Sequence, residues 1–317
     1  PPAPAAVARE GAPRIRALFP LDPPMPDTAA PAAATPATDA VPRWPVRYLL
    51  FIAGLGGLLY GIDIGIIAGA LPYLEATASQ AWQLSSQQLG MVVAAVLLGS
   101  VLSSLFAGLI ADLIGRRGVM LLAAVLFTAS IPVMALASGY TPLLLGRLLQ
   151  GVSGGLIGVV VPLYLAETLG PELRGRGAAM FQLLLTVGLM LAALIGLYHA
   201  IAVGAGAEAA RGLSIGEEAH LLLAGKGPAW RTIFWSCLLP GVVFCIGVLW
   251  LAESPRWLAR RGHLDAARRS LRRSVPASQV ESTLASIQAP VVAQAQDERD
   301  RLLSRRYVVP FLLACVV

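Results

Sequence analysis

Long apolar runs dominate this sequence and restrict what it can fold into. They cover residues 48–74, 89–111, 118–138, 142–165, 177–203 and 232–251. Each is close to the roughly 20 residues that a helix needs to cross a bilayer. Backbone polar groups in lipid must be satisfied internally, so runs of this length predict membrane-spanning helices. A further run opens at residue 307, but at about eleven residues it is too short to span.

The composition supports a membrane protein and offers no sign of catalysis. Hydrophobic residues make up 56% of the chain and charged residues 13%, whereas soluble domains carry about 25% charged residues. Cys237, Cys245 and Cys315 lie in or beside apolar runs without the spacing of metal ligands, so we expect buried hydrophobic side chains there. The sequence contains no nucleophile–base pair or phosphate loop. We therefore predict neither an enzyme nor a metal or other cofactor.

The basic residues predict the orientation of the chain in the membrane. They cluster before the first run, between the second and third, between the fourth and fifth, and after the sixth: Arg43, Arg47, Arg116, Arg117, Arg174, Arg176 and an Arg-dense stretch from Arg256 to Arg273. All of these positions fall on one side of the membrane. The positive-inside rule therefore predicts a cytoplasmic N-terminus, and this placement of the net charge of +6 argues against a nucleic-acid partner.

Changes in composition along the chain predict its domains. Residues 1–46 are rich in Pro and Ala and are expected to form a disordered cytoplasmic tail. Residues 47–253 would form the transmembrane bundle. Residues 254–306 show apolar positions at helical spacing opposite Arg, which predicts a cytoplasmic helical linker or, alternatively, a basic segment lying on anionic lipid. Residues 307–317 would begin a seventh, truncated helix.

Two isolated charges lie within the apolar runs. Asp63 lies in the first run and Arg147 near the start of the fourth. A charge at bilayer depth costs roughly 2.5–3.5 kcal/mol on insertion scales, so such residues usually have a partner, a cavity or a function. An acid and a base on different helices can neutralise each other, and the acid can take up and release a proton. This favours proton-coupled transport over the alternative, in which the pair only fixes two helices together.

Glycines in the first run predict how its helix packs. Gly57, Gly61, Gly65 and Gly69 are four residues apart, forming a small-residue stripe that allows another helix to approach closely. At 100° per residue, Asp63 lies roughly opposite the centre of this stripe. We expect the helix to be buried on two sides, one packed closely and one facing a polar cavity.

Several motifs occur in a fixed order around these runs. They are Gly56-Gly57-Leu-Leu-Tyr60-Gly61-Ile-Asp63, Gly108-Leu-Ile-Ala-Asp112-Leu-Ile-Gly115-Arg116-Arg117, Gly146-Arg147, Pro162-Leu-Tyr164-Leu-Ala-Glu167 with Arg174-Gly175, Gln182, and Glu253-Ser254-Pro255-Arg256-Trp257-Leu258. From about residue 45 onward, the series resembles the sugar porter family of the major facilitator superfamily. The resemblance implies an all-α fold of two six-helix bundles joined by short cytoplasmic helices, with sugar bound between the bundles. This chain would be the N-terminal bundle.

The resemblance also implies roles for individual residues. Asp63 matches the protonatable acid of proton-linked members, and Arg147 its partner. Gln182 and Tyr60 would contact the sugar. A cytoplasmic charge network that latches the outward-facing state would comprise Asp112, Arg116, Arg117, Glu167, Arg174, Glu253 and Arg256.

The sequence departs from the family pattern at three positions and at its end. Leu189 stands where some members have a second Gln, Ala252 replaces a Pro, and Gly170 occupies the position where the family has Pro, with Pro171 one residue later. The second bundle is absent. We expect either a fragment of a longer protein or a truncated product that needs a partner half.

The sequence favours symport of a monosaccharide with a proton across a bacterial inner membrane. The expected partners are sugar, proton, the lipid bilayer and the missing C-terminal bundle. Two alternatives remain at this stage: an uncoupled sugar or polyol facilitator, and a transport-inactive membrane protein with a sensing or assembly role.

Overall fold

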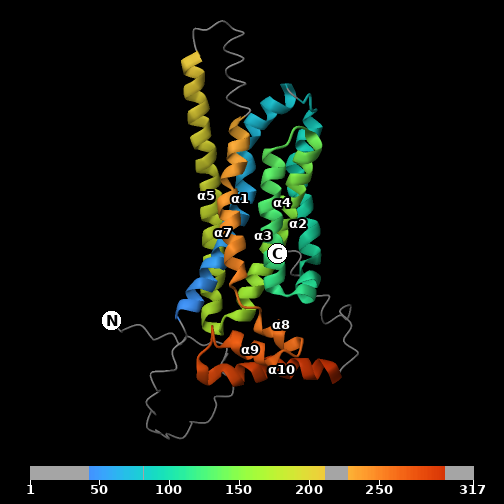
Figure 1. Ribbon diagram of the computed structural model, residues 1–317, viewed down its shortest axis with the longest axis vertical. Coiled ribbons are helices and arrows are strands. Elements are labelled where there is room, and N and C mark those ends of the chain that lie inside the picture. Colours follow the sequence, from blue (N-terminus) through green and yellow to red (C-terminus); the bar gives the residue numbers. More distant parts are fainter. Residues whose placement is uncertain (1–42, 81, 211–227, 297–317) are drawn as a thin grey trace, which may run out of the picture. The chain divides into compact units, whose positions relative to one another are not determined.

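The computed structural model describes residues 43–80, 82–210 and 228–296, and every regular element in these ranges is helical. The long helices are α1 (Arg43–Gln80), α2 (Ser86–Ile114), α3 (Arg116–Ala135), α4 (Tyr140–Thr168) and α5 (Pro171–Ala210) (Figure 1). A helical segment at 228–236 continues through Cys237 into α7 (Leu238–Leu249). The shorter elements that follow are α8 (Pro255–Arg260), α9 (Leu264–Leu271), η2 (Ala277–Gln279) and α10 (Val280–Gln296).

The described residues confirm the six predicted spans. Segments long and apolar enough to cross a membrane run from Trp44 to Ala76, Ser86 to Ile114, Arg116 to Ala135, Tyr140 to Thr168, Pro171 to Ala205 and Pro228 to Leu249. Helix α1 begins at Arg43, ahead of the tail boundary predicted at residue 46, because Pro45 is tolerated in a first helical turn. The predicted tail before it, the seventh run and Cys315 lie outside the described residues.

The glycine stripe of α1 packs closely against another helix, as predicted, and that helix is α5. A Cβ at Gly69 would lie 2.8 Å from the Cα of Gly196, and one at Gly61 would overlap the backbone carbonyl of Leu185. Only residues without a side chain allow two helix backbones to approach this closely. Helices α1 and α5 therefore pack backbone to backbone along much of their length.

The outer surface of the bundle is largely apolar. Only 28% of the most apolar 18-residue segment of α2 is buried, and only 17% of the corresponding segment of α5. Their exposed side chains include Leu97, Leu105, Leu109, Leu194 and Leu197. Such a surface suits lipid tails or a second bundle rather than water.

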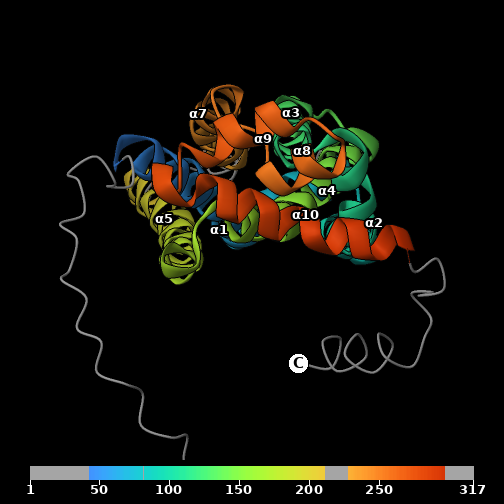
Figure 2. The same ribbon diagram turned by 90° about the horizontal axis from the view of Figure 1, so that it is seen from below.

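The short helices α8, α9 and α10 form a small unit at one end of the bundle (Figure 2). Their own core consists of Ala259, Ala267, Leu271, Val275, Val280 and Leu284. Exposed Arg269 and Arg272 lie on the opposite face of α9, so the amphipathic pattern predicted for this segment is observed. This unit brings the residues before α8 against the ends of α2, α3 and α4.

Candidate functional site

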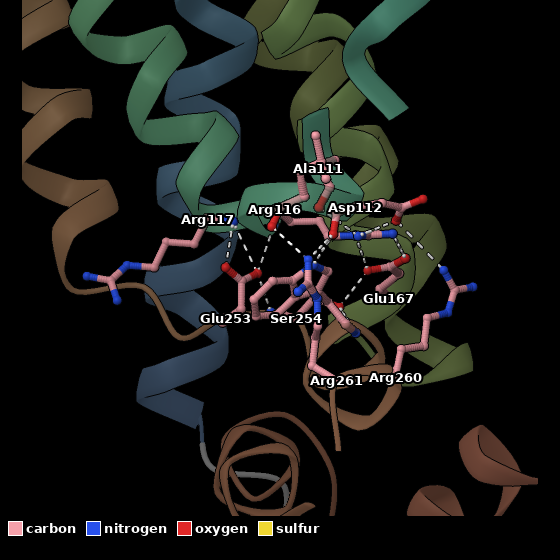
Figure 3. Close-up of polar contacts among 11 residues, drawn as sticks. Ala111, Asp112, Arg116, Arg117, Glu167, Glu253, Ser254, Arg260 and Arg261 are labelled. Atoms are coloured by element: carbon pink, nitrogen blue, oxygen red, sulfur yellow. Dashed lines mark hydrogen bonds and ion pairs between the residues drawn. The ribbon is translucent and has the colours of Figure 1, made fainter. Parts of the chain in front are cut away.

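A charge network surrounds Arg116 at the start of α3 (Figure 3). The chain turns sharply from α2 into α3 at Gly115, whose φ of 87° favours glycine. The Arg116 side chain is buried, and its Nη1 donates to Asp112 Oδ1 at 2.8 Å and to the Ala111 carbonyl at 2.9 Å. Its Nη2 donates to Glu167 Oε1 at 3.0 Å, and its Nε lies 2.8 Å from Glu167 Oε2. One guanidinium therefore links the ends of α2, α3 and α4.

Glu253, 137 residues after Arg116 in the sequence, binds the N-terminus of α3. Its Oε1 accepts from the backbone N–H groups of Arg116 at 2.9 Å, Arg117 at 3.1 Å and Ser254 at 2.7 Å. A carboxylate is favoured there because the first N–H groups of a helix lack partners and carry partial positive charge. A Cβ at Gly115 would lie 2.8 Å from Cδ of Glu253, so this contact also requires glycine at the turn.

Ser254 connects the network to α8. Its hydroxyl donates to Glu167 Oε2 at 2.5 Å and accepts from the backbone N–H of Trp257 at 3.3 Å, which makes Ser254 the N-cap of α8. Pro255 occupies the first helical position, where its missing N–H costs nothing. Nearby, the Tyr164 hydroxyl donates to the Ala252 carbonyl at 2.7 Å. The segment before α8 is thus held by side chains of α4 and by the start of α3.

Three further arginines bind the carbonyl ends of helices. Arg117 donates to the carbonyls of Val248 and Leu249 at the end of α7. Arg261 donates to the carbonyls of Asp112 at 3.0 Å and Leu113 at 2.9 Å, near the end of α2. Arg174 donates to the carbonyl of Leu169, the C-cap of α4, at 3.2 Å. Cations suit these ends because the last carbonyls of a helix are unpaired and partly negative.

The network gathers most, but not all, of the residues predicted for it. Asp112, Arg116, Arg117, Glu167 and Glu253 are connected by the bonds described above. Arg174 binds only the end of α4, and Arg256 is exposed, without a hydrogen bond or ion pair to any described residue.

The prediction missed Ser254, Trp257 and Arg261 as members of the network. Trp257 donates from Nε1 to the Asp112 carbonyl at 3.0 Å. The Ser-Pro pair at 254–255 is a helix-start signal that could have identified the N-cap. No comparable signal in the sequence pointed to Arg261.

Asp63 and Arg147 lie in the interior of the bundle, each with 1% of its surface exposed. Asp63 faces α4, since a Cβ at Gly154 would lie 2.8 Å from its Oδ2. Tyr60, one turn earlier on α1, is half-buried and lies beside Gly158. Asp63 therefore lies on the side of α1 away from the glycine stripe, as predicted, but against packed α4 rather than on the wall of an open cavity.

The two buried charges are not joined directly. Arg147 Nη1 donates to Gln150 Oε1 at 2.7 Å, on its own helix. Asp63 Oδ1 and Arg147 Nε have no hydrogen-bond partner, and no ion pair joins the two residues within the described ranges. The interaction between Asp63 and Arg147 is therefore electrostatic attraction without a direct contact. The sequence predicted both residues at this depth, but it did not predict that Gln150 would be the hydrogen-bond partner of Arg147.

Gln182 lies apart from this pair, on the exposed surface of α5. Its backbone carbonyl accepts from the Thr186 hydroxyl at 3.0 Å, and its exposed side chain makes no hydrogen bond to any described residue. The two residues predicted to contact sugar, Gln182 and Tyr60, thus differ in exposure.

Several curated proteins similar in sequence to this chain are named as sugar transporters. The chain is 30% identical to the glucose transporter GlcP of Staphylococcus epidermidis over 75% of its length and 47% of that protein. It is 32% identical to a D-xylose transporter of Levilactobacillus brevis, over 71% of its length and 43% of that protein. It is 30% identical to the galactose-proton symporter of Escherichia coli K12, over 71% and 42%. The chain therefore spans about half the length of these relatives.

Solved structures show the same fold. The proton:xylose symporter XylE bound to 6-bromo-6-deoxy-D-glucose matches with a TM-score of 0.69 at 24% identity, over 83% of this chain and 56% of that one. A partially occluded, inward-open XylE from E. coli matches with a TM-score of 0.63 at 23% identity, over 80% and 60%.

The sequence as a whole carries the family signature. The profile of the family described as "Sugar (and other) transporter" matches residues 49–317. Because this match covers most of the chain, the chain belongs to the sugar porter family of the major facilitator superfamily.

Proposed function

We propose that this chain forms the N-terminal bundle of a proton-coupled monosaccharide symporter that works by alternating access. Its N-terminus and α8–α10 would lie on the cytoplasmic side of a bacterial inner membrane. Support comes from family membership and from relatives named as glucose, xylose and galactose-proton transporters. Sugar would bind between this bundle and a C-terminal bundle, supplied by a longer chain or by a partner half.

The coupling proposal rests on the burial of Asp63 and on its lack of a direct bond to Arg147. Its carboxyl group is buried at membrane depth, with Oδ1 unpartnered and a buried cation nearby that is not bonded to it. A carboxyl group in such a place can exist with or without its proton, and the choice changes how it interacts with Arg147. Protonation of Asp63 would weaken its attraction to Arg147 and so bias the packing of α1 against α4.

Sugar binding would use the polar groups of α1 and α5. Gln182 is an exposed polar residue on a helix whose exposed side chains are largely apolar beyond its first turns, which suits a hydroxyl-bearing ligand held between two bundles. Tyr60 lies one helical turn from Asp63 and is half-buried, so a sugar bound to Tyr60 would lie close to the coupling residue.

The charge network at the α8–α10 end would act as the latch of the outward-facing state. Its buried charges are all paired, and it connects α2, α3, α4 and α8 through short bonds. A set of contacts that forms in one state and breaks in another supplies the two-state element that substrate binding can bias.

The test is transport by the native protein that contains this chain, reconstituted into liposomes. Asp63→Asn should abolish sugar accumulation against a gradient, because coupling needs a proton that asparagine cannot carry, while counterflow exchange continues. The matched control is Glu75→Gln, which removes a carboxylate from an exposed position on the same helix and should preserve accumulation.

Accumulation that survives Asp63→Asn would refute the coupling role. Uptake by the unmodified protein that does not change with external pH would indicate an uncoupled facilitator instead. Loss of both accumulation and exchange in Asp63→Asn would show that Asp63 is needed for the conformational cycle itself.

A further inference from the structure

A cavity of about 290 Å³ lies between the α4–α5 turn and the short helices η2, α9 and α10. One wall is the chain from Glu167 to Arg174, and the other runs from Leu271 to Ile287. This volume is near the lower limit for small-molecule sites. The cavity is separate from the membrane-depth pair and from the exposed surface of α5 that carries Gln182.

Two cations and a helix start give this cavity a positive character. Arg174 and Arg256 both line it, and Arg256 has no partner among the described residues. The first turn of α5, a helix of 40 residues, forms part of the same wall. The N-terminus of a helix carries partial positive charge and favours anions.

A buried hydroxyl without a partner also lines the cavity. Ser274 is 2% exposed, and its Oγ lacks a hydrogen-bond partner among the described residues. An unpaired buried hydroxyl costs free energy, so a polar group that entered the cavity and bonded to Ser274 would recover that cost. Gln279, Thr283 and Ser286 add further polar groups from η2 and α10.

Two acids also line the cavity, and neither cancels its positive character. Glu167 is already neutralised by Arg116 and bonded to Ser254. Glu172 is exposed in the first turn of α5 and sets one acid against the two arginines of the lining.

We propose that this cavity binds a phosphoryl group, held by Arg174 and Arg256, the start of α5 and the hydroxyl of Ser274. Paired guanidinium groups, hydroxyl donors and a helix N-terminus are the groups that proteins use to bind phosphate. The phosphoryl group could belong to a small phosphate monoester of the cytoplasm or to a phospholipid headgroup. Once bound, it would tie the α4–α5 turn to α9 and α10, beside the Glu167 that belongs to the charge network.

The test is a calorimetric titration of the purified native protein with inorganic phosphate. The ionic strength is kept constant with chloride. Saturable binding is expected. Arg256→Ala should weaken it by about tenfold, as expected for loss of a charge-assisted bond. Ser274→Ala, which barely changes the shape of the protein, should weaken it by about threefold. The matched control is Arg269→Ala, which removes an equal charge from an exposed position outside the cavity and should bind as the unmodified protein does.

A second arm separates the two sources of phosphate. The protein is placed in nanodiscs of phosphatidylcholine with or without phosphatidic acid, and the phosphate titration is repeated. Competition by phosphatidic acid that Arg256→Ala removes would assign the site to a lipid headgroup, and its absence would assign it to a soluble monoester. Equal weakening by Arg256→Ala and Arg269→Ala, or no saturable phosphate binding and no phosphatidic acid effect, would overturn the proposal. The assay needs neither sugar nor a proton gradient, so its outcome is independent of the proposed transport function.

Discussion

The bundle contains two buried arginines whose surroundings differ sharply. Arg116 is 4% exposed and donates to two carboxylates and a backbone carbonyl, whereas Arg147 is 1% exposed and donates to one neutral amide. Their acids differ in the same way. Glu167 is bonded to Arg116 and Ser254, while Asp63 keeps an unpartnered oxygen. A buried charge with all its partners stabilises one arrangement, and a buried charge without them is free to change state.

The largest expected effect is the loss of Arg116. Arg116→Met keeps much of the side-chain length but leaves the buried Glu167 without its cation, which should cost about 3–5 kcal/mol of unfolding free energy. Denaturant unfolding of the purified protein in detergent measures this. Arg260→Met is the control, because Arg260 is exposed and lies 3.8 Å from Asp112, and it should change the unfolding free energy very little.

Asp63→Asn should change stability much less than Arg116→Met. The carboxylate makes no direct ion pair, and asparagine has the same size, so we expect a shift within about 1 kcal/mol in either direction. The same unfolding measurement compares the two variants. If Asp63→Asn were as destabilising as Arg116→Met, the contrast between a paired and an unpaired buried charge would be wrong.

The smallest effect is expected at an exposed pair on α9 and α10. The hydrogen bond from Arg268 Nε to Glu281 Oε1, at 2.6 Å, lowers the pKa of Glu281 below its ordinary value. Because the folded-state pKa is lowered, the contribution of the pair is complete above the ordinary pKa of about 4.3 and is lost as the pH falls through the folded value. Amide protection in α10, taken as the intrinsic exchange rate at each pH divided by the observed rate, should therefore fall slightly on acidification, and it should fall less in Glu281→Gln. Glu172→Gln, which removes an exposed acid on α5, should leave this pH response unchanged, and an equal response in all three proteins would contradict the prediction.

The fold was predictable because its signal is long and repeated. Apolar runs locate the spanning helices even though their ends shift by a few residues, since a helix satisfies its own backbone and continues into polar surroundings. The stripe from Gly57 to Gly69 predicted the tight contact of α1 correctly. It could not identify α5 as the partner, because spacing describes one helix face and not what covers it.

The candidate site was only partly predictable. The charged residues stood out by type and motif, and five of the seven predicted latch residues form one connected network. Their bonding depends on tertiary position: Arg256 faces a cavity instead of the network, and Arg147 bonds Gln150 on its own helix. The role of Arg261 arises only when α8 folds back beneath α2, which no local pattern encodes.

The contact between α1 and α5 has a mechanical consequence. With Gly69 and Gly196 nearly touching and Gly61 against the Leu185 backbone, neither helix can slide or roll without the other. We therefore expect α1 and α5 to move together, with Asp63 partway along α1 and the start of α5 bordering the cavity between the α4–α5 turn and the short helices. A displacement of the start of α5 would therefore tilt both helices and change the position of Asp63.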